Sequence, residues 1–306
     1  MGMWLKKVSL LILALFFALH LNFASAAMTS TNYQIQWDEL SSGGGDASSS
    51  SYNIRDSTAG SAAGSRTTSL SYGIDQGFRA GVYDPVVDFV PYVQDRSTQV
   101  AATAFASNTV TVTTAAGFSV GDWIVIIQDE GASQVAAMGQ ISGISGSDIT
   151  IRSSYSGNTP TIDGTNDLVY RMSPTASNAL GTLSSSVVTT QIVGWVASAD
   201  VSQGFGVYAF VDGLLQSESA TLAGVVDGSV TAGNSEYGAR SSDASLATST
   251  FDTEDTAFST EPVLVGSTSI SSFNSSGFLT LKAAISATQN GGSYAQTLTT
   301  IFVGDY

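Results

Sequence analysis

The chain has 306 residues, of which ten are basic and 25 are acidic, and its formal net charge at pH 7 is −15. It contains no cysteine and one histidine, His20, which excludes disulfide bonds and leaves the rest of the chain without donors for zinc or copper sites built from His or Cys. Clustered Lys and Arg are needed to neutralise phosphates, so we expect no binding to nucleic acid or to anionic lipid.

The N-terminus has the three parts of a secretory signal peptide. Two lysines precede an almost wholly apolar stretch at residues 8–23, and Ala-Ser-Ala follows at residues 24–26. The apolar stretch is shorter than the ~20 residues of a membrane-spanning helix. We therefore expect a helical signal peptide over residues 1–26, cleaved after Ala26 or Ala27, and no membrane span in the mature chain. An uncleaved anchor is the alternative.

Loss of the signal peptide makes the chain more acidic. Of the ten basic residues, Lys6 and Lys7 are removed, which leaves eight against 25 acidic residues. His20 is removed as well, and Lys282 is then the sole lysine. Since only 11% of all residues are charged, the remaining surface must be Ser, Thr, Gly, Asn and Gln. Such a surface is typical of extracellular β-proteins.

Residues 27–84 are expected to form a repeated β-unit. A Tyr-x-Ile unit occurs three times, with its tyrosines 19 and 20 residues apart, at Tyr33, Tyr52 and Tyr72. Alternation with period two places the Tyr and Ile of each unit on one face of a strand. Gly-Gly-Gly at residues 43–45 and the Gly/Ala/Ser run at residues 59–65 predict turns between the strands. A Ser/Gly linker with chance tyrosines is the alternative.

A linker is expected at residues 85–94, where Pro85 and Pro91 flank a short apolar stretch. A small β-barrel-like module is then expected over residues 95–174. Five short strands separated by Gly, Ser and Asn turns are predicted in it, at residues 108–113, 123–127, 138–144, 148–152 and 168–172.

Residues 178–306 are expected to form an immunoglobulin-like β-sandwich. Strands are predicted at residues 192–199, 205–211, 262–265, 278–285 and 296–303. A long polar loop is predicted at residues 244–260. The chain is therefore classed as all-β, since no mature segment shows an extended helical period.

The last two strands are expected to form a hairpin around the Asn-Gly-Gly turn at residues 290–292. Its first strand alternates Leu279, Leu281 and Ile285 with polar or small residues. The pattern predicts that Leu281 is buried and that Lys282 lies on the solvent face.

Three segments resemble modules of exported bacterial proteins. The Tyr-x-Ile units, with residues 43–45 and 77–78, resemble a repeat of exported proteins from environmental bacteria. Residues 117–122, 144–146 and 149–151 are similar to a small β-module of bacterial surface and phage-tail-like proteins. Residues 236–238 and 284–299 resemble the end of an immunoglobulin-like surface module and, more weakly, cell-wall-binding WxL domains. The chain has no Trp-x-Leu tripeptide, and the resemblance carries over no catalytic residue.

Catalysis by Ser-His-Asp or Cys-His groups needs residues that the mature chain lacks. Paired carboxylates, as in glycoside hydrolysis, are the remaining catalytic alternative. The candidates are Asp129, Glu130, Glu236, Asp252, Glu254 and Asp255. Carboxylates of a secreted acidic protein are usually solvated, so we expect no enzymatic activity.

No cofactor is expected, and calcium is the ion that fits the composition best. Calcium takes several oxygen ligands from carboxylates, amides and backbone carbonyls. Asp163, Asn166 and Asp167 form one of the densest oxygen clusters, and residues 252–255 form another. Neither cluster matches the twelve-residue calcium loop of helix–loop–helix proteins, and a plain polar turn is the simpler interpretation of both.

The sequence therefore predicts a secreted or cell-surface structural or adhesive protein without catalytic activity. Its expected partners are a cell-surface polymer, a glycan or another surface protein, and self-association is compatible with the pattern. The alternative is a carbohydrate-binding module protein that assists a polysaccharide-degrading or attachment system. That alternative requires exposed aromatic rings, whereas Trp37, Trp123 and Trp195 lie in apolar strand patterns and are expected in the core.

The mature protein is expected to begin at Ala27 or Met28, because the Ala-Ser-Ala site directly follows the apolar stretch. The intact mass of the exported chain measures this. A mass that still includes residues 1–26 would show that the segment is an anchor.

Overall fold

The computed structural model describes residues 87–305 continuously and, before them, only the backbone of short strands. These are β1 (Met28–Thr29), β2 (Gln34–Ile35), β3 (Gly43–Ser48), β4 (Asn53–Thr58), β5 (Thr67–Thr68) and β6 (Gly73–Ile74). The continuous part is built from β7 (Val87–Ala106), β8 (Thr109–Val112), β9 (Trp123–Gln128), β10 (Val135–Ser145), β11 (Asp148–Ile151), β12 (Ser156–Gly157), β13 (Leu168–Ser173), β14 (Thr189–Ala199), β15 (Phe205–Val211), β16 (Leu215–Gln216), β17 (Thr221–Gly224), β18 (Glu236–Ser241), β19 (Val263–Thr268), β20 (Ser272–Ala284) and β21 (Leu298–Gly304). The all-β class is confirmed.

In the N-terminal part, the isoleucine of each Tyr-x-Ile unit lies in a strand, in β2, β4 and β6. The predicted turn at residues 43–45 is wrong, because these glycines begin β3 and pair with β4, Gly45 opposite Asp56. Antiparallel pairing needs only extended backbone, which glycine adopts as readily as a turn. The signal peptide, the three tyrosines and Trp37 lie outside the described residues.

Six strands close into a barrel: the five that the sequence predicted in this region and β7, which it did not predict. Each of the pairs β7–β8, β8–β11, β11–β10, β10–β9, β9–β13 and β13–β7 is antiparallel, so the last strand returns to the first. The interior is filled by fully buried β-branched side chains, among them Val110, Ile124, Ile126, Ile149 and Val169. A barrel of this size is a packed core rather than a channel.

A two-layered β-sandwich forms the other half. One layer runs β7-β14-β20-β18-β17-β16, and the other is the three-stranded sheet β19-β15-β21. Inward-facing side chains such as Trp195, Val207, Val265 and Leu279 form the core between the layers. The predicted loop at residues 244–260 has no strand but contributes Phe251, which is completely buried in this core.

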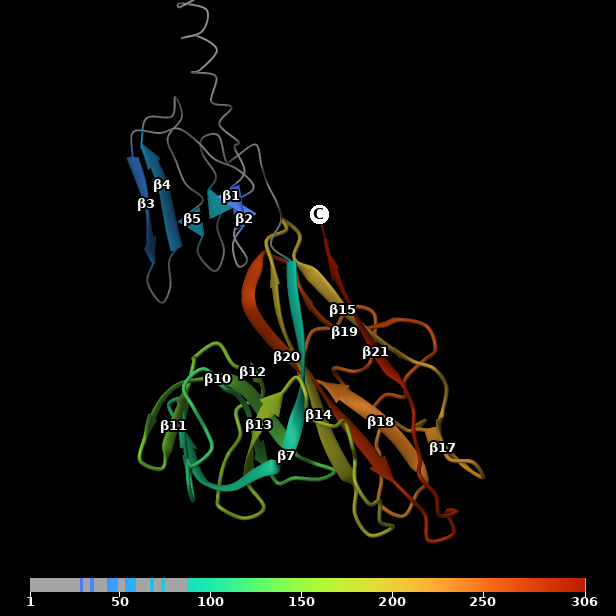
Figure 1. Cartoon of the computed structure of the whole chain (residues 1–306). Helices are drawn as coiled ribbons and strands as arrows, with labels where there is room; N and C mark the ends of the chain where they lie inside the picture. The colour runs from blue at the N-terminus through green and yellow to red at the C-terminus, as the bar shows by residue number, and fades with distance from the viewer. Residues whose placement is uncertain are drawn as a thin grey trace, which may run out of the picture. The chain divides into compact units, whose positions relative to one another are not determined.

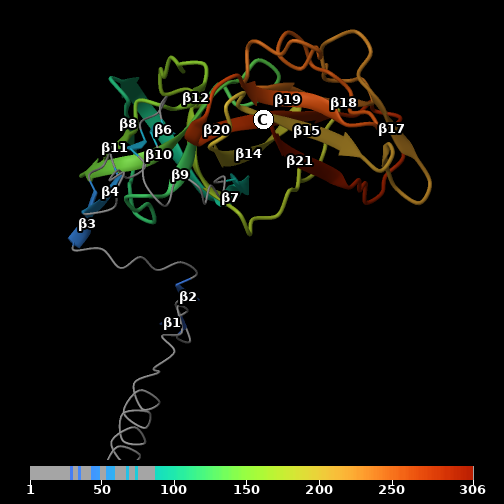
Figure 2. The same cartoon turned by 90° about the horizontal axis from the view of Figure 1, so that it is seen from above.

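Strands β14 and β20 form a wall that the two halves share (Figures 1 and 2). On one face, Trp195 and Leu279 belong to the sandwich core. On the other face, Ile192 and Phe278 pack against barrel residues that include Met138. Burial of one large apolar side chain contributes about 1.5–3 kcal/mol to the free energy of unfolding. The apolar contacts across this wall therefore hold the two halves together.

The linker expected at residues 85–94 is instead the beginning of β7. This 20-residue strand pairs with β14 through Val87–Val93 and then with β13 and β8 in the barrel. Its pairing with β13 is interrupted between Asp95 and Val100, where the strand passes from sandwich to barrel. Pro91 lies earlier, opposite Trp195 of β14, and β13 pairs with β7 only from Val93 onward. A proline without a backbone donor is tolerated at such an edge position.

The predicted C-terminal hairpin is also wrong. Strand β20 pairs with β14 and β18, whereas β21 pairs with β15 in the opposite layer. The segment between them therefore crosses from one layer of the sandwich to the other. Local turn signals cannot distinguish such a crossing from a hairpin, because both need the same residue types at the bend.

Trp195 lies over two glycines, one from each layer. A Cβ atom built on Gly277 or Gly266 would come within 2.5 Å of Trp195 Cζ2. Both positions have ordinary backbone conformations, so the glycines are required for space rather than for backbone geometry. The buried indole, 4% exposed, confirms the prediction that this tryptophan is core, and Trp123 is buried likewise.

Gly277→Ala is expected to destabilise the protein by about 1–3 kcal/mol, because the added methyl must displace the indole in a packed core. Denaturant unfolding followed by tryptophan fluorescence measures the change. Gly143→Ala is the matched control, since a Cβ there meets nothing within 4 Å, and it should stay within about 0.5 kcal/mol of wild type. Equal effects of the two substitutions would contradict the packing argument.

Candidate functional site: a buried polar junction and the adjoining cavity

Lys282 is buried, which overturns its predicted solvent exposure. It is 7% exposed, and Leu281 beside it is only partly buried. The alternation along β20 is real, but both faces of the strand are covered. The face that carries Lys282 and Phe278 turns toward the barrel, and the face that carries Leu279 turns toward the sandwich core.

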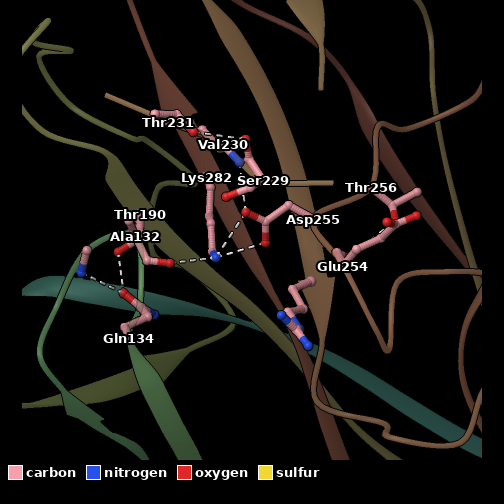
Figure 3. Close-up of polar contacts among 12 residues, drawn as sticks. Ala132, Gln134, Thr190, Ser229, Val230, Thr231, Glu254, Asp255, Thr256 and Lys282 are labelled. Atoms are coloured by element: carbon pink, nitrogen blue, oxygen red, sulfur yellow. Dashed lines mark hydrogen bonds and ion pairs between the residues drawn. The ribbon is translucent and has the colours of Figure 1, made fainter. Parts of the chain in front are cut away.

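The ammonium group of Lys282 pairs with the carboxylate of Asp255, which is 4% exposed. Nζ lies 2.8 Å from Oδ1 and 3.1 Å from Oδ2. The backbone N–H of Val230 also donates to Oδ2, at 3.0 Å. Figure 3 shows the two side chains meeting between β20 and the loop that carries Asp255.

Lys282 also connects the two halves of the protein. Nζ donates a 2.8 Å hydrogen bond to the carbonyl oxygen of Ala132, in the barrel loop before β10 (Figure 3). The neighbouring Gln134 Oε1 accepts from Thr190 Oγ1 of β14, at 2.6 Å. Charged hydrogen bonds strengthen where water is excluded, so this loop is held against the shared wall.

A second cluster of polar side chains lies beside the first, at the bend of β7. Arg96 donates from Nε to Gln191 Oε1 at 2.8 Å and from Nη2 to the carbonyl of Thr190. Its Nη1 lies 3.5 Å from Glu130 Oε1. The Tyr170 hydroxyl donates to Glu130 Oε2 at 3.1 Å, and burial followed by the negative charge of Glu130 raises the pKa of Tyr170.

The candidate catalytic carboxylates are engaged separately. Asp255 pairs with Lys282 and Glu130 lies beside Arg96, as described above, while Glu236 Oε1 accepts from the backbone of Thr231 at 2.8 Å. Asp129, Asp252 and Glu254 lie on loops, and none of them is in the hydrogen bonds or ion pairs of Lys282 or Arg96 given above. Hydrolysis by two carboxylates needs both to face one substrate bond, and the contacts of Asp255, Glu130 and Glu236 point to different partners.

The candidate calcium residues form a closed loop before β13. Asp167 is buried, and its carboxylate accepts from the backbone N–H of Asp163 and Gly164, each at 2.8 Å, and of Asp129 at 3.1 Å. The Asn166 side chain donates to the carbonyl of Glu130 at 2.8 Å. These hydrogen bonds engage the Asp167 carboxylate within the protein and hold the loop in a closed turn. Among residues 87–305, no group of three acidic or other metal-ligating side chains is arranged around a common point, and calcium binding by this loop stays a prediction.

A cavity of about 710 Å³ opens beside the junction, between two loops at residues 178–183 and 289–296. Its other walls come from β18, β20 and β21 and from Phe258. Lys282 also lines it. No local sequence pattern indicates this cavity, because its residues come from separate parts of the chain between residues 178 and 298.

The comparisons with known proteins find no match: no family model, no curated protein and no solved structure is similar to this chain. Within the part of the chain that the structure describes, no helix is long and apolar enough to cross a membrane.

Lys282→Met is expected to cost about 3–5 kcal/mol of unfolding free energy, because it leaves the charge of Asp255 buried without a partner. The double variant Lys282→Met/Asp255→Leu should regain much of this loss, since no isolated charge remains. Denaturant melts at fixed pH measure all variants.

Arg240→Met is the control, because Arg240 is an exposed cation on the neighbouring strand β18. It should stay within about 0.5 kcal/mol of wild type. A loss for Lys282→Met no larger than this would show that the ion pair is not sequestered from water.

Proposed function

We propose that this chain is a secreted extracellular or cell-surface protein that acts by adhesion and as structure, without catalysis. The observation that carries the proposal is the fusion of barrel and sandwich into one body. The shared wall of β14 and β20 and the Lys282 contacts to Asp255 and Ala132 hold the two halves together. A continuous strand β7 and a shared wall between the two halves suit a protein that bears load in attachment.

The chemistry of the junction supports a role without catalysis. Lys282 is held as a paired cation, and Glu130 faces Arg96 and Tyr170. A general base must be free to reach a proton on the substrate, whereas these groups satisfy one another. After residue 20 the chain also has no histidine and no cysteine.

Secretion and an immunoglobulin-like C-terminal module belong to the same proposal. The signal-peptide pattern supports export, and the antiparallel two-layer sandwich is compatible with such a module. The alternative is a carbohydrate-binding module protein that assists a polysaccharide-degrading or attachment system, and it is favoured by one observation: the 710 Å³ cavity has aromatic and amide side chains in its walls.

Export is tested by expressing the full chain with a C-terminal epitope in a bacterial host. The epitope is expected in the medium or on intact cells, where added protease removes it. The matched control lacks residues 2–26 and should stay inside the cell. Retention of the full chain in the cytoplasm would refute the extracellular assignment.

Adhesion is tested with beads that carry the purified mature chain, applied to insoluble cell-wall polysaccharide. Retention above that of beads carrying an unrelated acidic β-protein supports the proposal. Labelling of a serine by a fluorophosphonate probe would instead show a catalytic protein, and retention equal to the control beads would contradict adhesion to this polymer.

A further inference from the structure

We propose that the cavity between residues 178–183 and 289–296 binds a neutral saccharide, which makes it the adhesive site. The inference rests on the proposed adhesive function and names the ligand class. It is carried by the size of the cavity, by its aromatic side chains, by unused neutral hydrogen-bonding groups and by the absence of carboxylates from its walls.

The cavity volume of about 710 Å³ lies within the ~300–1,000 Å³ range of small-molecule sites. Half-buried apolar side chains form much of the lining, including Leu183, Leu281 and Ile285. A mostly apolar lining with a few polar groups is the usual composition of such a site. The cavity is therefore large enough for one or two sugar rings.

Three aromatic residues line the cavity: Tyr237, Phe258 and Tyr294. Tyr294 and Phe258 are partly exposed, so part of each ring is accessible to a ligand. A pyranose ring has an apolar C–H face that packs on such rings. The two tryptophans of the described part, Trp123 and Trp195, are buried in the cores and are not available for this contact.

Some neutral polar groups of the cavity keep hydrogen-bonding capacity, although each glutamine Nε2 also donates to a backbone carbonyl, of Thr221 or Gly213. Gln296 Nε2 donates to the Tyr237 hydroxyl at 2.7 Å, and Gln289 Nε2 donates to the Tyr294 hydroxyl at 2.6 Å. Among the described residues, neither Oε1 atom accepts a hydrogen bond, and the Tyr237 hydroxyl donates none. Tyr237 is 4% exposed, so the two half-buried glutamine oxygens are the acceptors that face the cavity, and a sugar hydroxyl can donate to them.

The charge of the lining favours a neutral ligand. No Asp or Glu lines the cavity, although the chain has 25 acidic residues. The sole cation of the lining, Lys282, is neutralised by Asp255. A cationic ligand would find no carboxylate in the walls, and an anionic ligand would enter an acidic protein without a free cation to receive it.

The proposal is tested by saturation-transfer-difference NMR on the mature protein with cellotetraose, mannotetraose and chitotetraose at millimolar concentration. At least one of these neutral probes is expected to receive saturation, and titration calorimetry then gives its affinity. Tetragalacturonate is the acidic probe and is expected to receive none. Saturation of tetragalacturonate alone, or of no probe, would overturn the proposal.

Tyr294→Ala should weaken saccharide binding about tenfold or more, because an aromatic face and the hydrogen-bond partner of Gln289 are lost.

Ser293→Trp is a second variant. Ser293 is exposed at the cavity, so an indole there blocks the cavity without removing an internal contact. Tyr155→Ala is the matched control, since Tyr155 is a partly exposed barrel tyrosine outside the lining. Unchanged affinity in Ser293→Trp would place the saccharide elsewhere.

The bead assay separates this proposal from the proposed function. If beads carrying Ser293→Trp are retained as well as wild-type beads, adhesion stands and the cavity is not its site. If wild-type beads are not retained but the NMR probes bind and Ser293→Trp abolishes their binding, the saccharide site stands and adhesion to that polymer fails. Thermal melts confirm that each variant is folded.

Discussion

The structure depends on covering both faces of strands β14 and β20. An antiparallel sheet ordinarily buries one face and exposes the other to water. Here Trp195 and Leu279 are buried on one face by the three-stranded sheet, while Ile192 and Phe278 are buried on the other by the barrel. The barrel and the sandwich therefore share their central wall, and the long strand β7 takes part in both.

Burial of the second face explains the polar junction. Where apolar packing against the barrel ends, β20 still carries Lys282 on the covered face, and a charge cannot stay buried without a partner. Asp255 supplies the opposite charge from a loop, and the carbonyl of Ala132 supplies an acceptor from the barrel. The pair costs desolvation and adds little net stability, but it restricts how the two halves meet.

The adjoining cavity lies where the wall ends and the chain crosses between layers. Strand β20 continues into the loop at residues 289–296, which carries the chain to β21 in the opposite layer. The loop at residues 178–183 closes the other side. The same crossing that replaces the expected hairpin thus creates the site that we assign to a neutral saccharide.

The sequence by itself determined the all-β class, five of the six barrel strands and the sandwich strands β14, β15, β19, β20 and β21, because period-two alternation and turn residues are local signals. Strand β7 and the short strands β16, β17 and β18 were not predicted. The tertiary structure decided which strands pair, so residues 85–94 and 296–303 were misassigned as linker and hairpin partner. It also decided the environment of Lys282. Alternation divides a strand into two faces but carries no information on whether the second face meets water or another part of the chain, and here the barrel covers it.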